Sequence, residues 1–155
     1  MKKFIQEREL YTRIYFCGSI RGGRQLEAVY RTLIQMLQDY GEVLTEHVGE
    51  PGKESALDRH LTDRQIHDRD LKWIMKSDVV VAEVTIPSLG VGYEIGRAIE
   101  LEKPVLCLFD SSYGNKLSAM IAGSERVSLK EYSTPDDLAG VLKQFISAHV
   151  PRRTS

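Results

Sequence analysis

Unbroken apolar runs and helical periods alternate along the chain. The apolar runs predict five strands, at residues 14–17, 43–48, 79–84, 105–109 and 127–129. Apolar residues at spacings of three and four predict helices, over about 25–40 and 62–76, from 93 through 101, over a short piece at 117–121, and from 134 onwards. Strands that alternate with helices indicate parallel βαβ units. The predicted fold class is therefore α/β, a doubly wound parallel sheet of five strands.

The length of 155 residues suits one domain with a substantial core. We expect a polar leader over residues 1–12, a single α/β domain over 13–148 and a frayed tail over 149–155. In an open parallel sheet, ligands bind beyond the carboxyl ends of the strands, where the strand order reverses. The loops that follow the strands are therefore the places to look for chemistry.

The stretch 78–98 combines a strand, a glycine-rich turn and a helix. Its strand reads as buried on both faces, and it ends in turn chemistry that includes Ser88, Gly90 and Gly92. We expect the helix to begin at Tyr93, which puts Glu94 in its first turn. Because unpaired backbone N–H groups at a helix start attract anions, this loop is predicted to hold a phosphate beside Glu94.

A second glycine-rich turn, at 18–23, follows the first strand. It matches neither the dinucleotide fingerprint nor the P-loop, and Gly90-Val91-Gly92 with Gly96 has its third glycine one place late for that fingerprint. A smaller phosphorylated ligand fits both loops better, with Arg21 as a bidentate partner for one phosphate. The alternative is that both loops are simple tight turns.

The helix predicted at 62–76 has a capping-box start and an apolar stripe that contains Asp70 and leaves Arg69 outside. An acid on the inward face of a helix needs a partner. Asp70 and Glu94 together form a candidate carboxylate pair for chemistry at the anomeric carbon of a sugar. The alternatives are a buried salt bridge between Asp70 and an arginine, and a Glu94 that only complements the helix dipole.

Composition excludes several classes of function. The net charge of −1 argues against a nucleic acid polymer as partner, and no apolar run is long enough to cross a membrane. The four histidines have no ligand spacing and the two cysteines form no CxxC pair, so we expect no metal site. Cys17 and Cys107 fall in predicted strands, which fits a reducing cytoplasm, or the nucleus if the source is eukaryotic.

Several segments of the sequence together match the pattern of a known family: Tyr15 to Arg24, Leu44 to Val48, Ala82 to Thr85, Pro87 to Glu94, Ile66-His67, Asp70-Leu71, Leu106 to Phe109 and Leu117 to Ile121. They resemble the 2′-deoxynucleoside 5′-phosphate N-hydrolases. They extend in register from about residue 15 to 123. The likeness is closer than that to the related nucleoside 2-deoxyribosyltransferases.

The resemblance implies a flavodoxin-like (Rossmann-like) homodimer that uses no cofactor and no metal. Its substrate would be a deoxynucleoside 5′-monophosphate, hydrolysed at the N-glycosidic bond to free base and 2-deoxyribose 5-phosphate. On matching positions, Glu94 becomes the nucleophile, Asp70 handles protons at the base and the sugar hydroxyl, and Tyr15 supports the site. The implied substrate-binding residues are Gly18, Ser19, Ile20, Arg21, His47, Ser88, Gly90, Ser118 and Met120.

Within that set, Ile20 and His47 would flank the base, and Ser118 would reach the phosphate from the partner subunit. Two other readings stay open from the sequence. One is a related enzyme, either a nucleoside deoxyribosyltransferase or a ribonucleotide N-hydrolase. The other is a non-catalytic nucleotide-binding sensor, against which the presence of both Asp70 and Glu94 weighs.

Overall fold

The computed structural model describes residues 12–150 except 22, 24, 53 and 54. Most of the expected polar leader and frayed tail, at 1–11 and 151–155, lies outside the described residues. The first strand includes Thr12, and the last helix ends at His149. No helix within the described residues is long and apolar enough to span a bilayer.

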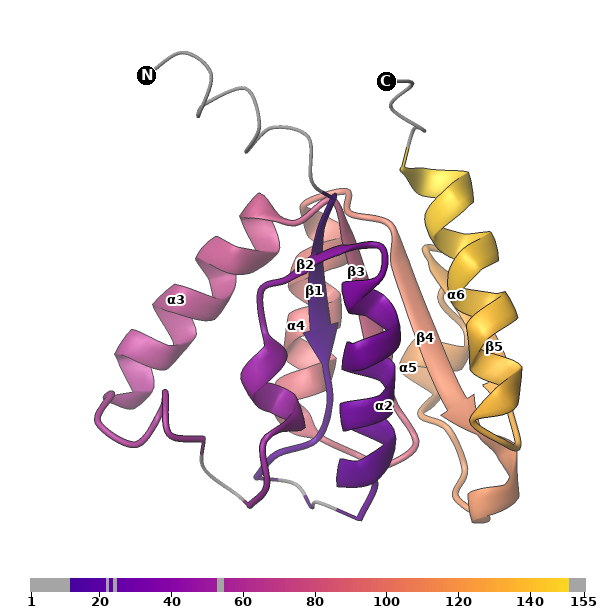
Figure 1. The fold of residues 1–155 in the computed structure, drawn as a ribbon, viewed down its shortest axis with the longest axis horizontal. Coiled ribbons are helices and arrows are strands. Elements are labelled where there is room, and N and C mark those ends of the chain that lie inside the picture. The colour runs from indigo at the N-terminus through magenta and orange to yellow at the C-terminus, as the bar shows by residue number, and fades with distance from the viewer. Residues whose placement is uncertain (1–11, 22, 24, 53–54, 151–155) are drawn as a thin grey trace.

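Five parallel strands form one sheet in the order β2-β1-β3-β4-β5 (Figure 1). The strands are β1 (Thr12–Cys17), β2 (Gly41–Val43), β3 (Val79–Glu83), β4 (Val105–Asp110) and β5 (Val127–Tyr132). This is the flavodoxin-like order, in which the order of the strands reverses between β1 and β3. The predicted fold class is confirmed, and β5 lies at an edge of the sheet.

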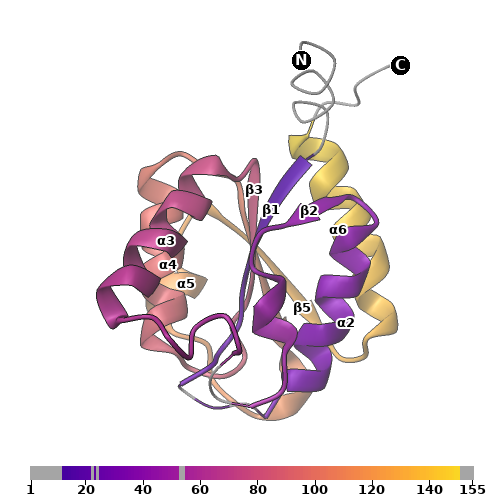
Figure 2. The same cartoon turned by 60° about the vertical axis from the view of Figure 1, so that its left-hand side comes forward.

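Helices cover both faces of the sheet (Figure 2). The helices α2 (Glu27–Gln38) and α6 (Asp136–His149) lie on one face. The other face carries α3 (Asp63–Lys76), α4 (Leu89–Glu100) and the short α5 (Ala119–Ala122). Alternate side chains of the central strands point to opposite faces, so the apolar residues form two cores, one on each side of the sheet.

The strand predicted at 43–48 is wrong in most of its length. β2 ends at Val43, and a 3-10 helix, η1 (Glu46–Gly49), follows. The cause is the buried side chain of Thr45. Its hydroxyl accepts a hydrogen bond from the backbone N–H of Phe16 at 2.8 Å and donates to the Phe16 carbonyl at 2.7 Å. The Thr45 side chain thus uses the N–H and C=O groups of Phe16, which the backbone of a longer β2 would have bonded.

The helix predicted to begin at Tyr93 begins four residues earlier. Ser88 is the N-cap of α4, and its hydroxyl accepts a hydrogen bond from the backbone N–H of Val91 at 3.3 Å. Gly90 therefore lies in the first helical turn rather than in a loop. Glu94 stands in the second turn, so the prediction that it lies in the first turn and complements the dipole there is wrong.

A buried polar cluster joins the ends of three strands. Glu83, the last residue of β3, is fully buried and accepts hydrogen bonds from the Thr85 hydroxyl, the Thr85 backbone N–H at 3.2 Å and the Tyr132 hydroxyl at 3.0 Å. The Thr85 carbonyl in turn accepts from the Asn115 amide at 2.9 Å. Burial raises the pKa of Glu83. The cluster fixes the segment that leads from β3 to the start of α4.

Candidate active site

A cavity of about 590 Å³ opens at the carboxyl ends of β1 and β3, where the strand order reverses. Its walls come from the loop after β1, from η1, from the inward face of α3 and from the first two turns of α4. This volume falls in the range of small-ligand sites. Among the described residues, no group of three or more His, Cys, Asp or Glu side chains is arranged to hold a metal ion.

Glu94 is directed at this cavity from α4. Its Oε1 accepts a hydrogen bond from the Tyr15 hydroxyl at 2.8 Å, and the nearby Cys17 thiol favours the ionised form of the carboxylate. The side chain keeps a partly exposed surface and lines the cavity. Burial raises the pKa of Glu94 to about 7, and the nearby Asp70 adds to the rise. The carboxylate is therefore reachable, oriented and only weakly acidic.

The early start of α4 explains how the glycines and Glu94 come to the same place. Gly90 and Glu94 are four residues apart in one helix, so they share a face and lie one turn from each other. Ser88, Gly90 and Glu94 all line the cavity. An absent side chain at Gly90 leaves the backbone open, since an added Cβ would meet only the Ser88 hydroxyl, at 3.9 Å.

Asp70 reaches the same cavity from α3, whose predicted capping box of Thr62 and Gln65 is present. Both readings of this residue hold at once, because it lines the cavity and is also paired with Arg69. Arg69 Nε donates to Asp70 Oδ1 at 2.9 Å, and Arg69 Nη2 lies 2.8 Å from the same oxygen. Burial raises the pKa of Asp70, and Arg69 opposes the rise.

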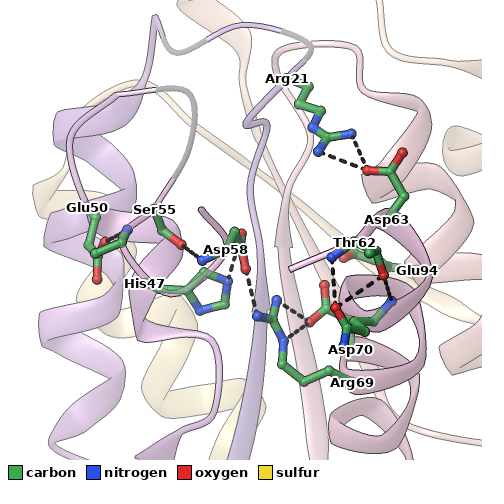
Figure 3. Close-up of polar contacts among 12 residues, drawn as sticks. Arg21, His47, Glu50, Ser55, Asp58, Thr62, Asp63, Arg69, Asp70 and Glu94 are labelled. Atoms are coloured by element: carbon green, nitrogen blue, oxygen red, sulfur yellow. Dashed lines mark hydrogen bonds and ion pairs between the residues drawn. The ribbon is translucent and has the colours of Figure 1, made fainter. Parts of the chain in front are cut away.

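Arg69 itself departs from the sequence pattern, which left it outside the apolar stripe. Its side chain is only 17% exposed, and its guanidinium lies 4.6 Å from the ring centroid of Trp73. Arg69 Nη1 is 2.6 Å from Oδ1 of Asp58, a buried residue of the segment before α3 (Figure 3). No pattern in the sequence pointed to Asp58, because that segment has neither periodicity nor a motif.

His47 lies at the far side of the same group. Its Nε2 is 3.9 Å from Asp58 Oδ2, and its ring lies 5.8 Å from that of Trp73. Burial lowers the pKa of His47, so the ring is neutral at physiological pH. The 3-10 helix η1 brings His47 to the cavity, which a continued β2 would not have done.

The loop after β1 supplies the opposite wall. Gly18, Ile20 and Arg21 line the cavity, and Arg21 forms an exposed ion pair with Asp63 at 3.1 Å (Figure 3). Ser19 is fully buried and does not line the cavity; its backbone N–H donates to the Tyr30 hydroxyl at 3.2 Å. The structure therefore puts Ser19 behind the loop rather than on its cavity surface.

Ser118 and Met120 do not reach the carboxylates within one chain. They line a second groove, of about 520 Å³, together with Ser88, Leu89 and Val91. Ser118 is the N-cap of α5 and accepts from the Met120 backbone N–H at 3.3 Å. Met120 is 83% exposed and Leu89 is 97% exposed, so large apolar side chains protrude beside this groove.

Fold and site together define a class. A flavodoxin-like sheet carries two carboxylates, from α3 and α4, into a cavity at the reversal of strand order, the arrangement expected for chemistry at a sugar carbon. The family model described as nucleoside 2-deoxyribosyltransferase matches residues 14–127. The chain belongs to that family.

Within this family, the chain is most usefully compared with curated relatives that share about half of its residues. The chain is 48% identical over 149 residues to the 5-hydroxymethyl-dUMP N-hydrolase of Mus musculus, covering 92% of this chain and 84% of the relative. It is 50% identical over 140 residues to the protein of the same name from Tetraodon nigroviridis, covering 87% and 97%. These matches confirm the resemblance to nucleotide N-hydrolases and agree with the expectation of an N-glycosidase.

A solved structure agrees at the level of the fold. The CMP N-glycosidase of Clostridium botulinum superposes with a TM-score of 0.61 at 18% identity, over 86% of this chain and 99% of that protein. At that identity the likeness concerns the arrangement of the sheet and helices.

Proposed function

We propose that this protein hydrolyses the N-glycosidic bond of 2′-deoxynucleoside 5′-monophosphates to free base and 2-deoxyribose 5-phosphate. The observation that carries the proposal is the Glu94 carboxylate, directed at a nucleotide-sized cavity by the Tyr15 hydroxyl at 2.8 Å, with Asp70 in the same cavity. The similarity to relatives named 5-hydroxymethyl-dUMP N-hydrolase supports the substrate class.

The first step is attack by Glu94. An oxygen of the ionised carboxylate forms a bond to C1′ of the sugar while the bond from C1′ to the base nitrogen breaks, and the electron pair leaves with the base. Asp70 delivers a proton to that base. In retaining glycosidases two carboxylates divide the work in this way. Because the pKa of Glu94 is about 7, a substantial fraction of the nucleophile is ionised at neutral pH.

Tyr15 directs the nucleophile. Its buried hydroxyl donates to Oε1 of Glu94, which fixes the carboxylate and stabilises its ionised form. In the second step, water attacks C1′ of the glycosyl-enzyme, Asp70 accepts the proton of that water, and Glu94 leaves as a carboxylate. The sequence of steps returns both acids to their starting state.

The loops orient the nucleotide. Ser88 and the backbone N–H of Gly90 bind the 5′-phosphate at the start of α4, and Arg21 closes on it from the loop after β1. Arg21 rests on Asp63 in an exposed ion pair, which contributes on the order of 0–1 kcal/mol, so exchanging Asp63 for a phosphate costs little. Ile20 and His47 flank the base on the opposite wall.

We also propose that the working unit is a homodimer. Leu89 and Met120 expose large apolar surfaces beside the groove that contains Ser118, and that groove adjoins the phosphate loop at Ser88. Contiguous exposed apolar surface of this kind marks an interaction site. A two-fold interface is isologous, so each subunit would both receive and donate Ser118 at the phosphate.

Base release from a panel of deoxynucleotides and ribonucleotides tests the proposal by chromatography. Wild-type protein is expected to release base from deoxynucleoside monophosphates, and Glu94→Ala is expected to release none while still binding nucleotide. Glu100→Ala, on the exposed side of the same helix, is the matched control and should act as wild type. Transfer of the sugar to an added acceptor base at the expense of hydrolysis would instead identify a transferase.

The covalent step has its own test. A nucleotide with fluorine at C2′ slows departure of the sugar from the enzyme, because fluorine destabilises the positive charge that develops at C1′. Intact-protein mass spectrometry should then detect protein plus fluorinated sugar phosphate, and peptide mapping should locate it on Glu94. If turnover occurs without any adduct, or if Glu94→Ala retains activity, the nucleophilic role of Glu94 is refuted.

A further inference from the structure

Asp70 is the last member of a chain of three charged residues, Asp58, Arg69 and Asp70. Asp58 contacts Arg69 Nη1 at 2.6 Å, and Arg69 contacts Asp70 through Nε at 2.9 Å and Nη2 at 2.8 Å (Figure 3). Both Arg69 contacts fall on Oδ1 of Asp70. Within the described residues no hydrogen bond or ion pair is made to Oδ2, so that oxygen is left for whatever occupies the cavity.

The conformation of Arg69 is unusual for its place in the sequence. Neighbouring residues on a helix point about 100° apart and do not ordinarily face each other. Arg69 meets Asp70 because its guanidinium lies over Trp73, one turn further along, and is tied to Asp58 beyond the helix. Arg69 is largely buried yet does not line the cavity, whereas Asp70 and Asp58 do. Arg69 therefore acts on Asp70 rather than on a ligand.

We propose that Arg69, anchored by Asp58 and stacked on Trp73, is the positioning residue of Asp70: it fixes Oδ1 and presents Oδ2 to the substrate. The proposal deepens the proposed function and rests on it. The alternative for a buried arginine is a purely structural role, in which the ion pair stabilises α3 without affecting the chemistry of Asp70.

Several other charged or titratable groups also face Asp70. His47 and Asp58 approach from the η1 side, and Glu94, Tyr15 and Cys17 lie across the cavity. Of these neighbours, Asp58 disfavours ionised Asp70, whereas His47 favours it only when protonated, and burial lowers the pKa of His47. Arg69 is the cation in direct contact, so its removal has a predictable sign. Without it, the pKa of Asp70 must rise.

The deciding measurement is the titration of Asp70 by carbon NMR of protein labelled at the aspartate carboxyl carbons, with Asp70→Asn for assignment. Arg69→Gln should raise the pKa of Asp70 by about 1 unit or more, as expected for loss of an opposite charge in contact. Arg64→Gln is the matched control on the same helix, because the Arg64 side chain is 90% exposed. That control should leave Asp70 within about 0.3 units of wild type.

Asp58→Ala separates anchoring from simple electrostatics. The negative charge of Asp58 itself raises the pKa of Asp70, so its removal alone would lower that pKa. An upward shift can come only from an Arg69 that has lost its anchor, and an upward shift is the expected result. A downward shift would overturn the anchoring role. This variant leaves Arg69 in the chain, so it stays informative if Arg69→Gln does not fold.

Enzyme kinetics then distinguish a positioning role of Arg69 from a purely structural role and from a role in substrate binding. Arg69→Gln should lower kcat by about 10- to 100-fold through misplacement of Asp70, with KM within about twofold of wild type. A raised KM with unchanged kcat would make Arg69 a binding group, and an unmoved Asp70 titration would make it structural; either overturns the proposal. The NMR titration needs no turnover, so an inactive wild type would refute the proposed function without touching this test.

Discussion

Replacing Glu94 by glutamine should stabilise the protein at alkaline pH while it abolishes base release. Glutamine keeps the shape of the neutral acid, and its amide oxygen can still accept the hydrogen bond of Tyr15. It removes only the capacity to ionise. The substitution therefore isolates the cost of holding a carboxylate in this position, separately from the packing of the side chain.

The sign and size follow from the pKa of Glu94, about 7 in the folded protein against 4.5 for an exposed glutamate. Folded protein holds this proton more tightly than unfolded chain, so stability is lost as the pH rises from 4.5 through 7. The full shift corresponds to roughly 3 kcal/mol. Because Glu94 is partly exposed to the cavity, we expect less than the full shift. The free energy of unfolding of Glu94→Gln, relative to that of wild type, should rise by about 2 kcal/mol from pH 5 to pH 8.

Urea unfolding of both proteins at pH 5 and pH 8 measures this double difference, in which the titration of every other group cancels. Glu100→Gln is the control, since the Glu100 side chain is 68% exposed on the same helix and pairs with Arg97 at 2.8 Å. Its difference from wild type should stay within about 0.5 kcal/mol at both pH values. If Glu94→Gln gains no stability relative to wild type as the pH rises, Glu94 ionises freely in the folded protein. That result would refute the claim that burial raises the pKa of the proposed nucleophile.

Four further outcomes are expected. Tyr15→Phe removes the hydrogen bond that favours ionised Glu94, so the acidic limb of kcat/KM, near pH 7 in wild type, should move to higher pH; a limb that moves down contradicts this. Asp70→Asn should lose on the order of 10²–10⁴-fold in rate, and a loss under about threefold would leave Asp70 with a structural role. Arg21→Ala should weaken binding of the monophosphate by about 1.5–3 kcal/mol, measured by calorimetry, and the unphosphorylated nucleoside should be a very poor substrate of wild type. Glu94→Ala and Ser118→Trp chains should regain activity when mixed, because one site of the hybrid dimer carries neither lesion; hybrids seen by mass spectrometry without activity would confine Ser118 to its own subunit.

The fold was predictable because its signals are local and strong. The run Val79 to Val81, bounded by turn residues, leaves few alternatives to a buried strand, and the box of Thr62 and Gln65 marks the start of α3 to the residue. Asp70 stood out for the same reason, as an acid within an apolar stripe. The family resemblance then supplied roles for residues such as Tyr15, whose hydroxyl no periodicity could direct at Glu94.

Three features that the sequence did not predict share a different cause, because each depends on contacts between distant segments. Thr45 ends β2 by bonding to Phe16, 29 positions away, and nothing near Thr45 in the sequence indicates that partner. Arg69 looked solvent-facing because its anchor, Asp58, lies in a segment without a pattern. The pattern around Glu83 indicates only a strand, and its buried carboxylate depends on Tyr132 from the far edge of the sheet.

The early start of α4 has a consequence for how this segment can evolve. From Leu89, directly after the N-cap Ser88, to Glu94 the chain is already helix, so the rise between the proposed phosphate contact and the proposed nucleophile is fixed at about 9 Å by six residues of helix. A loop could absorb an extra residue by bulging. A helix cannot, and one inserted residue would turn Glu94 by about 100° away from Asp70. Side chains in this segment are free to change where they do not touch the ligand. The number of residues between Ser88 and Glu94 is not free to change, because the helix fixes the spacing of the two sites that hold the sugar phosphate.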